Sequence, residues 1–250
     1  MAGHSKWSKV KRFKGVLDAK RGKIFSRFSK EIMVAARMGG GDLNLNPRLR
    51  TAVLAARAQN MPNDTIDRAI KKGTGEIAGG IVEELMYEGY GPGGVAIIVE
   101  AATDNRNRTA ADIRSIFAKN HGNLAASGAV SYMFRRKGQI ALGKKGVDED
   151  KLMEIALEAG AEDLTTDEDL YVVTTPQDQL YQVGEAIKNA GMHVESQKLT
   201  FLPNTMVAVA KEELATQVLR LCDVLEDNDD VQNVYSNFDI SDELITKLSS

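Results

Sequence analysis

The stretch GVAIIVEAATDNRNRTAADIRSIFAKNHG, at residues 94–122, decides the fold. It opens with a near-continuous apolar run, which predicts a buried strand. It continues with a helical pattern, in which Thr109 and Asp112 have the spacing of a capping box. Residues 129–138, AVSYMFRRKG, predict a second strand. A β-α-β unit of this kind needs a second unit to cover its sheet, and the chain offers one near its end.

The matching unit lies at residues 205–238, where a strand, a helix and a strand are predicted in turn. Between the two units, residues 139–203 predict the order β-α-β-β-α-β, which is the ferredoxin-like order. We therefore expect a discontinuous middle domain at residues 79–135 and 205–250, with a third domain inserted at 136–204. Both are expected to be ferredoxin-like α/β sandwiches. A single long sheet would need longer crossovers than the sequence contains.

Residues 1–78 predict a helical bundle domain, so the expected fold class is α+β with three domains. Residues 18–41 combine an apolar stripe with a cationic face, which is typical of a surface helix. Asn46 and Pro47 are suited to the N-cap and the first position of a second helix. A third helix is expected at residues 61–73, with Gly73 as its C-cap. Residues 1–15 show no clean period and predict an extended or loosely ordered arm.

Charge is divided unevenly along the chain, although its formal net charge is only −3. Residues 1–75 contain 17 Lys and Arg against 5 Asp and Glu, a net charge of +12. The remaining residues contain 15 basic and 30 acidic side chains, a net charge of −15. A segment this basic predicts contact with a polyanion, usually nucleic acid, because each neutralised phosphate releases counterions. The alternative is a solvated basic face without a partner.

Two adjoining sets of side chains are the candidate nucleic-acid contacts at this end of the chain. The arm contributes Lys6, Trp7, Lys9, Lys11, Arg12 and Lys14. At about 100° per residue, the helix that follows places on one arc Lys20, Lys23, Arg27 and Lys30. We expect the cations of the two sets to form one continuous track for a nucleic-acid backbone, with Trp7 available to stack on bases.

The loop TDNRNRT, at residues 103–109, allows two interpretations. Its Asn and Asp side chains could bond to their own backbone, as is usual where a strand passes into a helix. Alternatively, Arg106 and Arg108 could present guanidinium groups to a phosphate or a base. The sequence favours neither interpretation, and both arginines are kept as candidate contacts.

No catalytic constellation can be assembled from the sequence, so we expect a protein that is not an enzyme and takes no metal, cofactor or small-molecule substrate. The three histidines are far apart and have no carboxylate at ligand spacing. The single cysteine, Cys222, lies in an amphipathic helical pattern and is expected to be a buried structural thiol. The glycines around Pro92 precede a strand, whereas a dinucleotide fingerprint follows one. No run reaches the roughly 20 apolar residues of a membrane span, so no membrane partner is expected.

Seven motifs along nearly the whole chain resemble those of the YebC/PmpR family. They are MAGHSKW, DAKRGKIFSRFSKEI, NPRLRTAV, NMPNDTIDRAIKKG, YEGYGPGGVAIIVE, TDNRNRT and HGNLAASGAVSYMF. The family includes mitochondrial translational activators of cytochrome c oxidase. The resemblance implies a helical N-terminal domain and two α/β domains, the last inserted into the middle one. Because the motif GHSKW begins at Gly3, as in bacterial members, the resemblance also implies a cytoplasmic bacterial protein without a presequence.

Three function classes stay open at this point. The family description favours a DNA-binding transcriptional regulator, which we take as the expectation. Members are also linked to translation on the ribosome, and an arm with Trp7 and Phe13 favours RNA, because aromatic side chains stack on unpaired bases. The third class is a protein-interaction adaptor that uses the acidic α/β domains.

Overall fold

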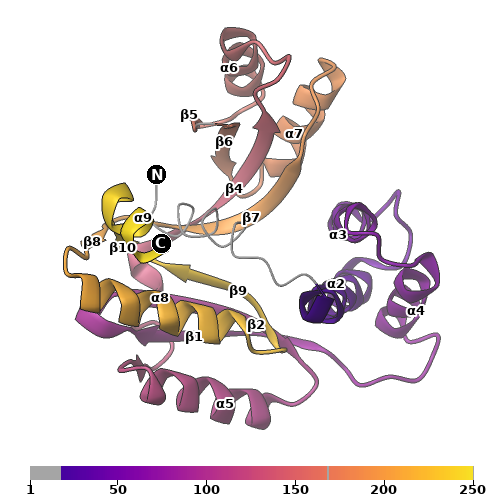
Figure 1. Cartoon of the computed structure of the whole chain (residues 1–250). Helices are drawn as coiled ribbons and strands as arrows, with labels where there is room; N and C mark the ends of the chain where they lie inside the picture. Colours follow the sequence, from indigo (N-terminus) through magenta and orange to yellow (C-terminus); the bar gives the residue numbers. More distant parts are fainter. Residues whose placement is uncertain (1–17, 168, 250) are drawn as a thin grey trace. The chain divides into compact units, whose positions relative to one another are not determined.

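The computed structural model describes residues 18–167 and 169–249, which divide into two compact units (Figure 1). The first unit contains the chain up to Phe134 and resumes at Pro203. The second unit is the segment Arg135–Leu202, which is inserted into the first. The arm expected at residues 1–15 lies outside the described residues.

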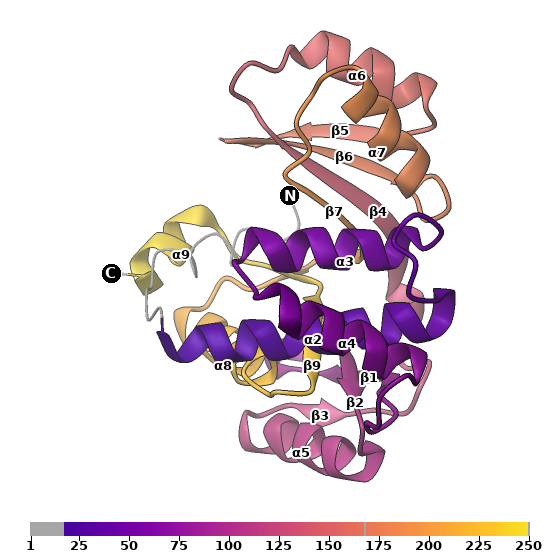
Figure 2. The same cartoon turned by 90° about the vertical axis from the view of Figure 1, so that its right-hand side faces the viewer.

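Three helices that pack on one another begin the described chain (Figure 2): α2 (Asp18–Gly39), α3 (Pro47–Ala58) and α4 (Asn63–Thr74). Their shared core includes Ile32, Leu49 and Ile66, which are almost fully buried. Asn46 caps α3 as predicted, because its Oδ1 accepts a hydrogen bond of 3.0 Å from the backbone N–H of Leu49. The predicted C-cap of α4 is wrong by two residues, since the helix continues through residue 73 and Gly75 takes the left-handed conformation.

A four-stranded antiparallel sheet with strand order β3-β1-β2-β9 forms the rest of the first unit. Its strands are β1 (Glu83–Tyr90), β2 (Ala96–Thr103), β3 (Asn123–Leu124) and β9 (Val231–Ser236). The strands β1 and β2 form a hairpin around the short helix η1 (Pro92–Gly94). Two helices, α5 (Arg106–Lys119) and α8 (Glu212–Glu226), share one apolar core with this sheet, and Cys222 is fully buried in it as expected.

The sheet of the first unit differs from the predicted one in three respects. The strand β1 comes from a segment for which the sequence predicts no strand. Residues 207–208, as β8 (Val207–Ala208), pair in parallel with β10 (Phe238–Asp239) in a separate two-stranded sheet, so they do not join β2. The strand expected at 129–138 contributes nothing to this sheet. The ferredoxin-like strand order expected of the middle domain is therefore wrong.

A single strand of the second unit, β4 (Phe134–Gly143), replaces the two strands expected at 129–138 and 139–142. Gly138 suggests an interruption in the sequence, but the strand runs through it. A Cβ at this position would lie 2.3 Å from Thr175 Oγ1 on the neighbouring strand. The glycine therefore permits close packing and does not mark a turn.

The second unit follows the predicted order β-α-β-β-α-β. After β4 come α6 (Glu149–Glu158), β5 (Asp163–Thr166), β6 (Leu170–Pro176), α7 (Leu180–Asn189) and β7 (Ser196–Pro203). The strands are arranged as β5-β6-β4-β7, and the core includes Ile140, Leu152 and Val173. The mixed α/β class is thus confirmed. The expected boundary between residues 78 and 79, which separates a helical domain from a middle domain, stays a prediction.

Two short helices complete the described chain, η2 (Ser131–Met133) and α9 (Asp242–Ser249). No helix within residues 18–167 and 169–249 is long and apolar enough to span a bilayer.

A buried carboxylate on β1, that of Glu88, holds the loop that follows β3. The backbone N–H groups of Gly128 and Val130 donate to it at 2.7 Å, and that of Ser131 donates at 2.8 Å. Burial disfavours the charged form of Glu88, but these backbone donors outweigh the burial and lower the pKa of its carboxyl group. The loop at residues 125–131 is therefore fixed by one acidic side chain from a neighbouring strand.

We expect Glu88→Gln to lower the free energy of unfolding by about 1–3 kcal/mol, because the amide NH2 would face backbone N–H donors and leave them unsatisfied. Urea denaturation at neutral pH measures the change. Glu154→Gln, at an exposed position of α6, is the control and should leave the midpoint in place. Equal midpoints for the two variants would show that the carboxylate is not needed to hold the loop.

Candidate nucleic-acid interface

The predicted contact residues are only partly covered by the structure. Those of the arm (Lys6, Trp7, Lys9, Lys11, Arg12 and Lys14) and the side chain of Lys20 lie outside the described part of the chain. Lys23, Arg27 and Lys30 lie on α2, and Arg106 and Arg108 lie in the first turn of α5. The structure brings Lys30 of α2 and Arg108 of α5 to one carboxylate, that of Asp230, although nearly 80 residues of sequence separate the two cations.

The cationic face of α2, defined here as Lys23, Arg27 and Lys30, contacts residues 226–230, which we call the α8 end. Lys23 Nζ donates to the backbone oxygen of Asp227, and Arg27 Nη2 donates to that of Glu226. The last carbonyls of a helix lack intrahelical partners and carry the negative end of the helix dipole. The cationic face of α2 therefore satisfies the carboxyl end of another helix in the same unit.

Burial and neighbouring carboxylates have opposite effects on the pKa of Arg27. Burial lowers the pKa of its guanidinium group, while the charges of Glu226, Asp227 and Asp229 act in the opposite direction. Its Nε is buried and has no hydrogen-bond partner among the described residues. An unsatisfied buried donor costs roughly 1–3 kcal/mol, so the contact between α2 and the α8 end is not fully satisfied.

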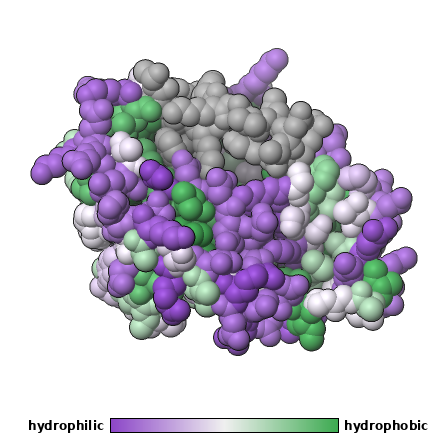
Figure 3. Space-filling view, turned by 60° about the horizontal axis from the view of Figure 1, so that its bottom comes forward, coloured by the Kyte–Doolittle hydropathy of each residue, from purple (hydrophilic) through white to green (hydrophobic). Residues whose placement is uncertain are grey.

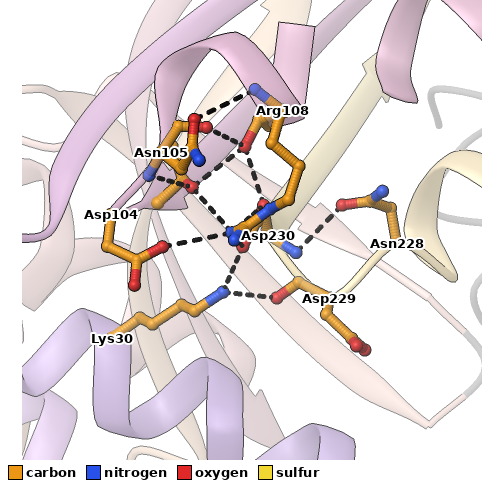
Figure 4. A network of polar contacts seen from close by, with 9 residues as sticks. Lys30, Asp104, Asn105, Arg108, Asn228, Asp229 and Asp230 are labelled. Carbon is orange, nitrogen blue, oxygen red and sulfur yellow. Dashed lines mark hydrogen bonds and ion pairs between the residues drawn. The ribbon is translucent and has the colours of Figure 1, made fainter. Parts of the chain in front are cut away.

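The third cation, Lys30, enters a network centred on the buried carboxylate of Asp230 (Figure 4). Lys30 Nζ donates to Asp230 Oδ1 at 2.6 Å and to the backbone oxygen of Asp229 at 2.8 Å. From α5, Arg108 Nη2 and Thr109 Oγ1 donate to Asp230 Oδ2 at 3.0 Å and 2.7 Å. The carboxylate thus joins α2, the start of α5 and the α8 end.

The donors around Asp230 keep it ionised. Burial raises the pKa of its carboxyl group, but hydrogen bonds from Lys30, Thr109 and Arg108 outweigh burial and lower the pKa to about 2. The backbone oxygen of Asp230 also accepts a hydrogen bond of 2.8 Å from Ala102 N–H, at the end of β2. Both the side chain and the main chain of this residue are therefore tied to the sheet domain.

In the loop at residues 103–109, side chains bond to the loop's own backbone, as in the first of the two interpretations of this loop. Asn105 caps α5 by accepting a hydrogen bond of 3.1 Å from Arg108 N–H. The expected capping box of Thr109 and Asp112 is wrong, because the helix begins earlier, at Arg106, and Thr109 lies inside it with its hydroxyl on Asp230. Arg108 also contacts Asp104 Oδ1 at 3.1 Å, so its guanidinium group is engaged within the fold.

Arg106 differs from Arg108 in its surroundings. Its side chain is 70 % exposed, and its Nε lies 3.8 Å from Glu83 Oε2, which makes a loose surface ion pair. Of the two arginines of this loop, Arg106 is therefore the one whose guanidinium group is open to a ligand.

A cleft of about 560 Å³ lies beside the Asp230 network. Its charged lining comes from α2, α4, α5 and the loops around them, and consists of Lys30, Lys72, Asp104, Arg108, Asp112, Asp229 and Asp230. Because these include four carboxylates and three cations, the cleft is not a basic pocket. Within the part of the chain that the structure describes, no group of three or more His, Cys, Asp and Glu could hold a metal ion.

Other basic residues of the three helices remain at the surface. Arg48 is engaged with Glu31 and Glu84, at 2.8 Å and 2.5 Å. In contrast, Arg68, Lys71 and Lys72 of α4 are exposed and form no ion pair with any described residue. The helix α3 contains three arginines and no acidic residue. The composition of the sequence signals this basic surface, but not which of its cations are already paired.

Figure 3 shows a face of the molecule on which hydrophilic residues predominate and hydrophobic residues form small, separate patches. The large exposed apolar side chains of the described residues are likewise spread over several elements, among them Leu45, Leu54, Tyr132 and Leu157. Scattered apolar residues are ordinary for a protein surface and do not mark a partner.

Two family models match the chain. Residues 5–76 match one described as the TACO1/YebC protein N-terminal domain, and residues 82–238 match one described as the TACO1/YebC second and third domain. The chain belongs to the TACO1/YebC family. This confirms the family resemblance found in the sequence motifs.

Relatives and a solved structure agree with this membership. A protein of Syntrophobacter fumaroxidans is 55 % identical, and one of Desulfotalea psychrophila is 57 % identical, each over the full length of both chains. Both are named probable transcriptional regulatory proteins. The crystal structure of a conserved hypothetical protein from Aquifex aeolicus is 48 % identical, with a TM-score of 0.84, and the match covers 90 % of this chain and 93 % of that one. The chain is thus similar over its whole length to proteins named probable transcriptional regulatory proteins.

We expect Arg108→Ala to lower the melting temperature clearly, because it removes a donor from the buried Asp230 carboxylate. Arg106→Ala is the matched control in the same turn of α5 and should leave the melting temperature unchanged. Differential scanning calorimetry of the two variants compares them. A loss of stability that is equal in both would contradict the roles assigned to the two arginines.

The lowered pKa of Asp230 predicts a specific pH dependence. Because the pKa falls from 3.8 to about 2 on folding, the ionised carboxylate stabilises the fold above about pH 4. This contribution, roughly 1–2 kcal/mol, should be lost as the pH falls from about 4 to about 2. Urea denaturation of the wild type and of Asp230→Asn over this range measures it. The variant should have the shallower pH dependence, and an identical dependence would refute the assignment.

Proposed function

We propose that the protein is a regulator that acts by binding nucleic acid, with duplex DNA as its partner in the control of transcription. The observation that carries the proposal is the division of charge, +12 in residues 1–75 against −15 in the rest. A basic module of this density attracts phosphates, while the acidic remainder repels them. The protein is thereby oriented so that its N-terminal segment meets the polyanion.

The described helices support this assignment. The exposed cations of α4 (Arg68, Lys71 and Lys72) form no ion pair with any described residue and are available to a phosphate backbone. The arm residues and Lys20 are further candidate contacts of the basic N-terminal segment, as judged from the sequence alone. Arg106 is a candidate for an additional contact from the sheet domain. The proposed activity is binding, and it assigns no catalytic step, cofactor or metal to the protein.

Duplex DNA is preferred as the partner because the similar proteins are named probable transcriptional regulatory proteins. A second candidate is structured RNA, including that of the ribosome. It is favoured by Trp7 and Phe13, which stand among the cations of the arm and could stack on unpaired bases.

We expect binding to duplex DNA to depend steeply on salt. If about five cations neutralise phosphates of the duplex, log K should fall with log[salt] with a slope of roughly −4.5, whereas the same five contacts on a single strand would give roughly −3.5. Deletion of residues 1–14 should flatten this slope and weaken binding, because the deletion removes five of the cations. Fluorescence anisotropy over a salt series, with the wild type and the deletion variant, measures both effects.

Matched probes separate the candidate partners. A duplex DNA and an RNA hairpin of the same length are compared at equal salt, with Trp7→Ala as the second variant. Weaker binding of this variant to the RNA loop, with duplex binding unchanged, would favour the RNA candidate, since stacking is worth about 1–3 kcal/mol per base. If the deletion leaves the salt slope unchanged, the charge division is not a nucleic-acid footprint, and a protein-interaction adaptor becomes the better description.

A further inference from the structure

We propose that the α8 end occupies the surface of α2 that a nucleic-acid backbone would otherwise contact, so that the two compete for the same cations. The inference rests on the proposed function, since it names how access to part of the basic surface is regulated. In the closed state seen here, the cationic face of α2 is covered by residues 226–230 of the same chain.

The α8 end offers α2 the kind of ligand that nucleic acid offers. Lys23, Arg27 and Lys30 span about 10 Å along α2 and meet a row of oxygens, partly from the backbone and partly from carboxylates. Phosphate oxygens are bound by the same lysine and arginine donors. Acidic side chains next to these oxygens add the negative charge that a phosphate backbone would bring.

The contact is polar, so its closed state can be exchanged for another polar partner. The apolar core around Ile32 and Leu49 shares no residue with the core around Val99 and Phe117. The buried Nε of Arg27 is unsatisfied in the closed state. A phosphate or water that reached this nitrogen would remove the cost of an unsatisfied donor.

Separation of α2 from the α8 end does not leave a buried charge without a partner. When Lys30 leaves, the Asp230 carboxylate still has Arg108 and Thr109 as donors. The backbone of Asp230 remains bonded to Ala102 N–H. The α8 end therefore stays with the sheet, and only its contact with α2 is lost.

The connection between α4 and β1 is suited to act as the hinge. Residues 75–82 form neither a helix nor a strand. All of them except Val82 are exposed. Gly79 and Gly80 lie in this connection, and glycine tolerates large backbone changes. Two other polar contacts of the helices, Arg37 with Val82 O and Arg48 with Glu84, lie at the β1 side of the hinge, where a rotation displaces atoms least.

Neutralising the α8 end tests the competition. Asp227→Asn combined with Asp229→Asn weakens its attraction for α2 and leaves all three cations in place. The control is Glu213→Gln with Glu243→Gln, which changes the net charge equally. Glu213 lies at the other end of α8, about 20 Å away along the helix, and both control residues are exposed.

Affinity for a duplex DNA of random sequence at low salt is the measurement. We expect the α8-end variant to bind about three- to tenfold more tightly than the control variant. Arg27→Ala in the background of the α8-end variant should abolish this gain, because it removes the middle cation of the released face. A gain only on an RNA hairpin would transfer the competition to that polyanion and overturn the inference as stated for duplex DNA.

The failures of the inference and of the proposed function are distinguishable. If all variants bind DNA with a steep salt dependence and the α8-end variant gains no more than the control, the competition is refuted and the proposed function stands. If neither the wild type nor the α8-end variant binds DNA, the proposed function fails and the inference fails with it.

Discussion

The buried carboxylate of Asp230 is the constraint on which the arrangement of the first unit depends. A carboxylate out of contact with water needs hydrogen-bond donors around it, and here two of its donor residues come from the start of α5 and one comes from α2. Lys30 comes from α2, and Arg108 and Thr109 come from α5. The same residue binds the end of β2 through its main chain. The helix α2, the segment where β2 passes into α5, and the α8 end are distant from one another in sequence, and the contacts of Asp230 bring them to one point.

Local features of the fold could be predicted from the sequence, because they depend on neighbouring residues. The cap at Asn46, the buried Cys222 and the element order of the second unit are examples. The strand β1 and the course of β4 through Gly138 could not be predicted, since strand partners are chosen by non-local pairing and by the space beside Thr175. The pairing of the short strand β8 with β10 could not be predicted for the same reason.

The candidate site shows the same division between local and non-local information. Its basic composition is visible in the sequence, but the pairing of Lys23 with Asp227 joins residues 204 positions apart. Nothing local to α2 signals this acceptor. The acidic run at residues 226–230 has the composition of a solvated turn, and only the fold identifies its partner.

The uneven charge of the chain has two consequences that must be considered together. It favours attraction of the basic helices to nucleic acid, and it also favours attraction of the same helices to the acidic remainder of the chain. Salt weakens both. If α2 leaves the acidic α8 end and binds nucleic acid instead, the nucleic acid releases cations, and the exposed α8 end takes up some of them. The observed salt slope would then be smaller than the number of phosphates contacted.

Hydrogen exchange of the backbone amides at residues 226–231 tests the central claim of competition most directly. In the free protein, Asp230 N–H is bonded to Asn228 Oδ1, and Val231 N–H is bonded to Asn228 O. Saturation with duplex DNA should make these amides exchange faster, because α2 no longer supports the α8 end, while the amides of α2 remain protected. Unchanged or slower exchange at residues 226–231 in a saturated complex would contradict the account.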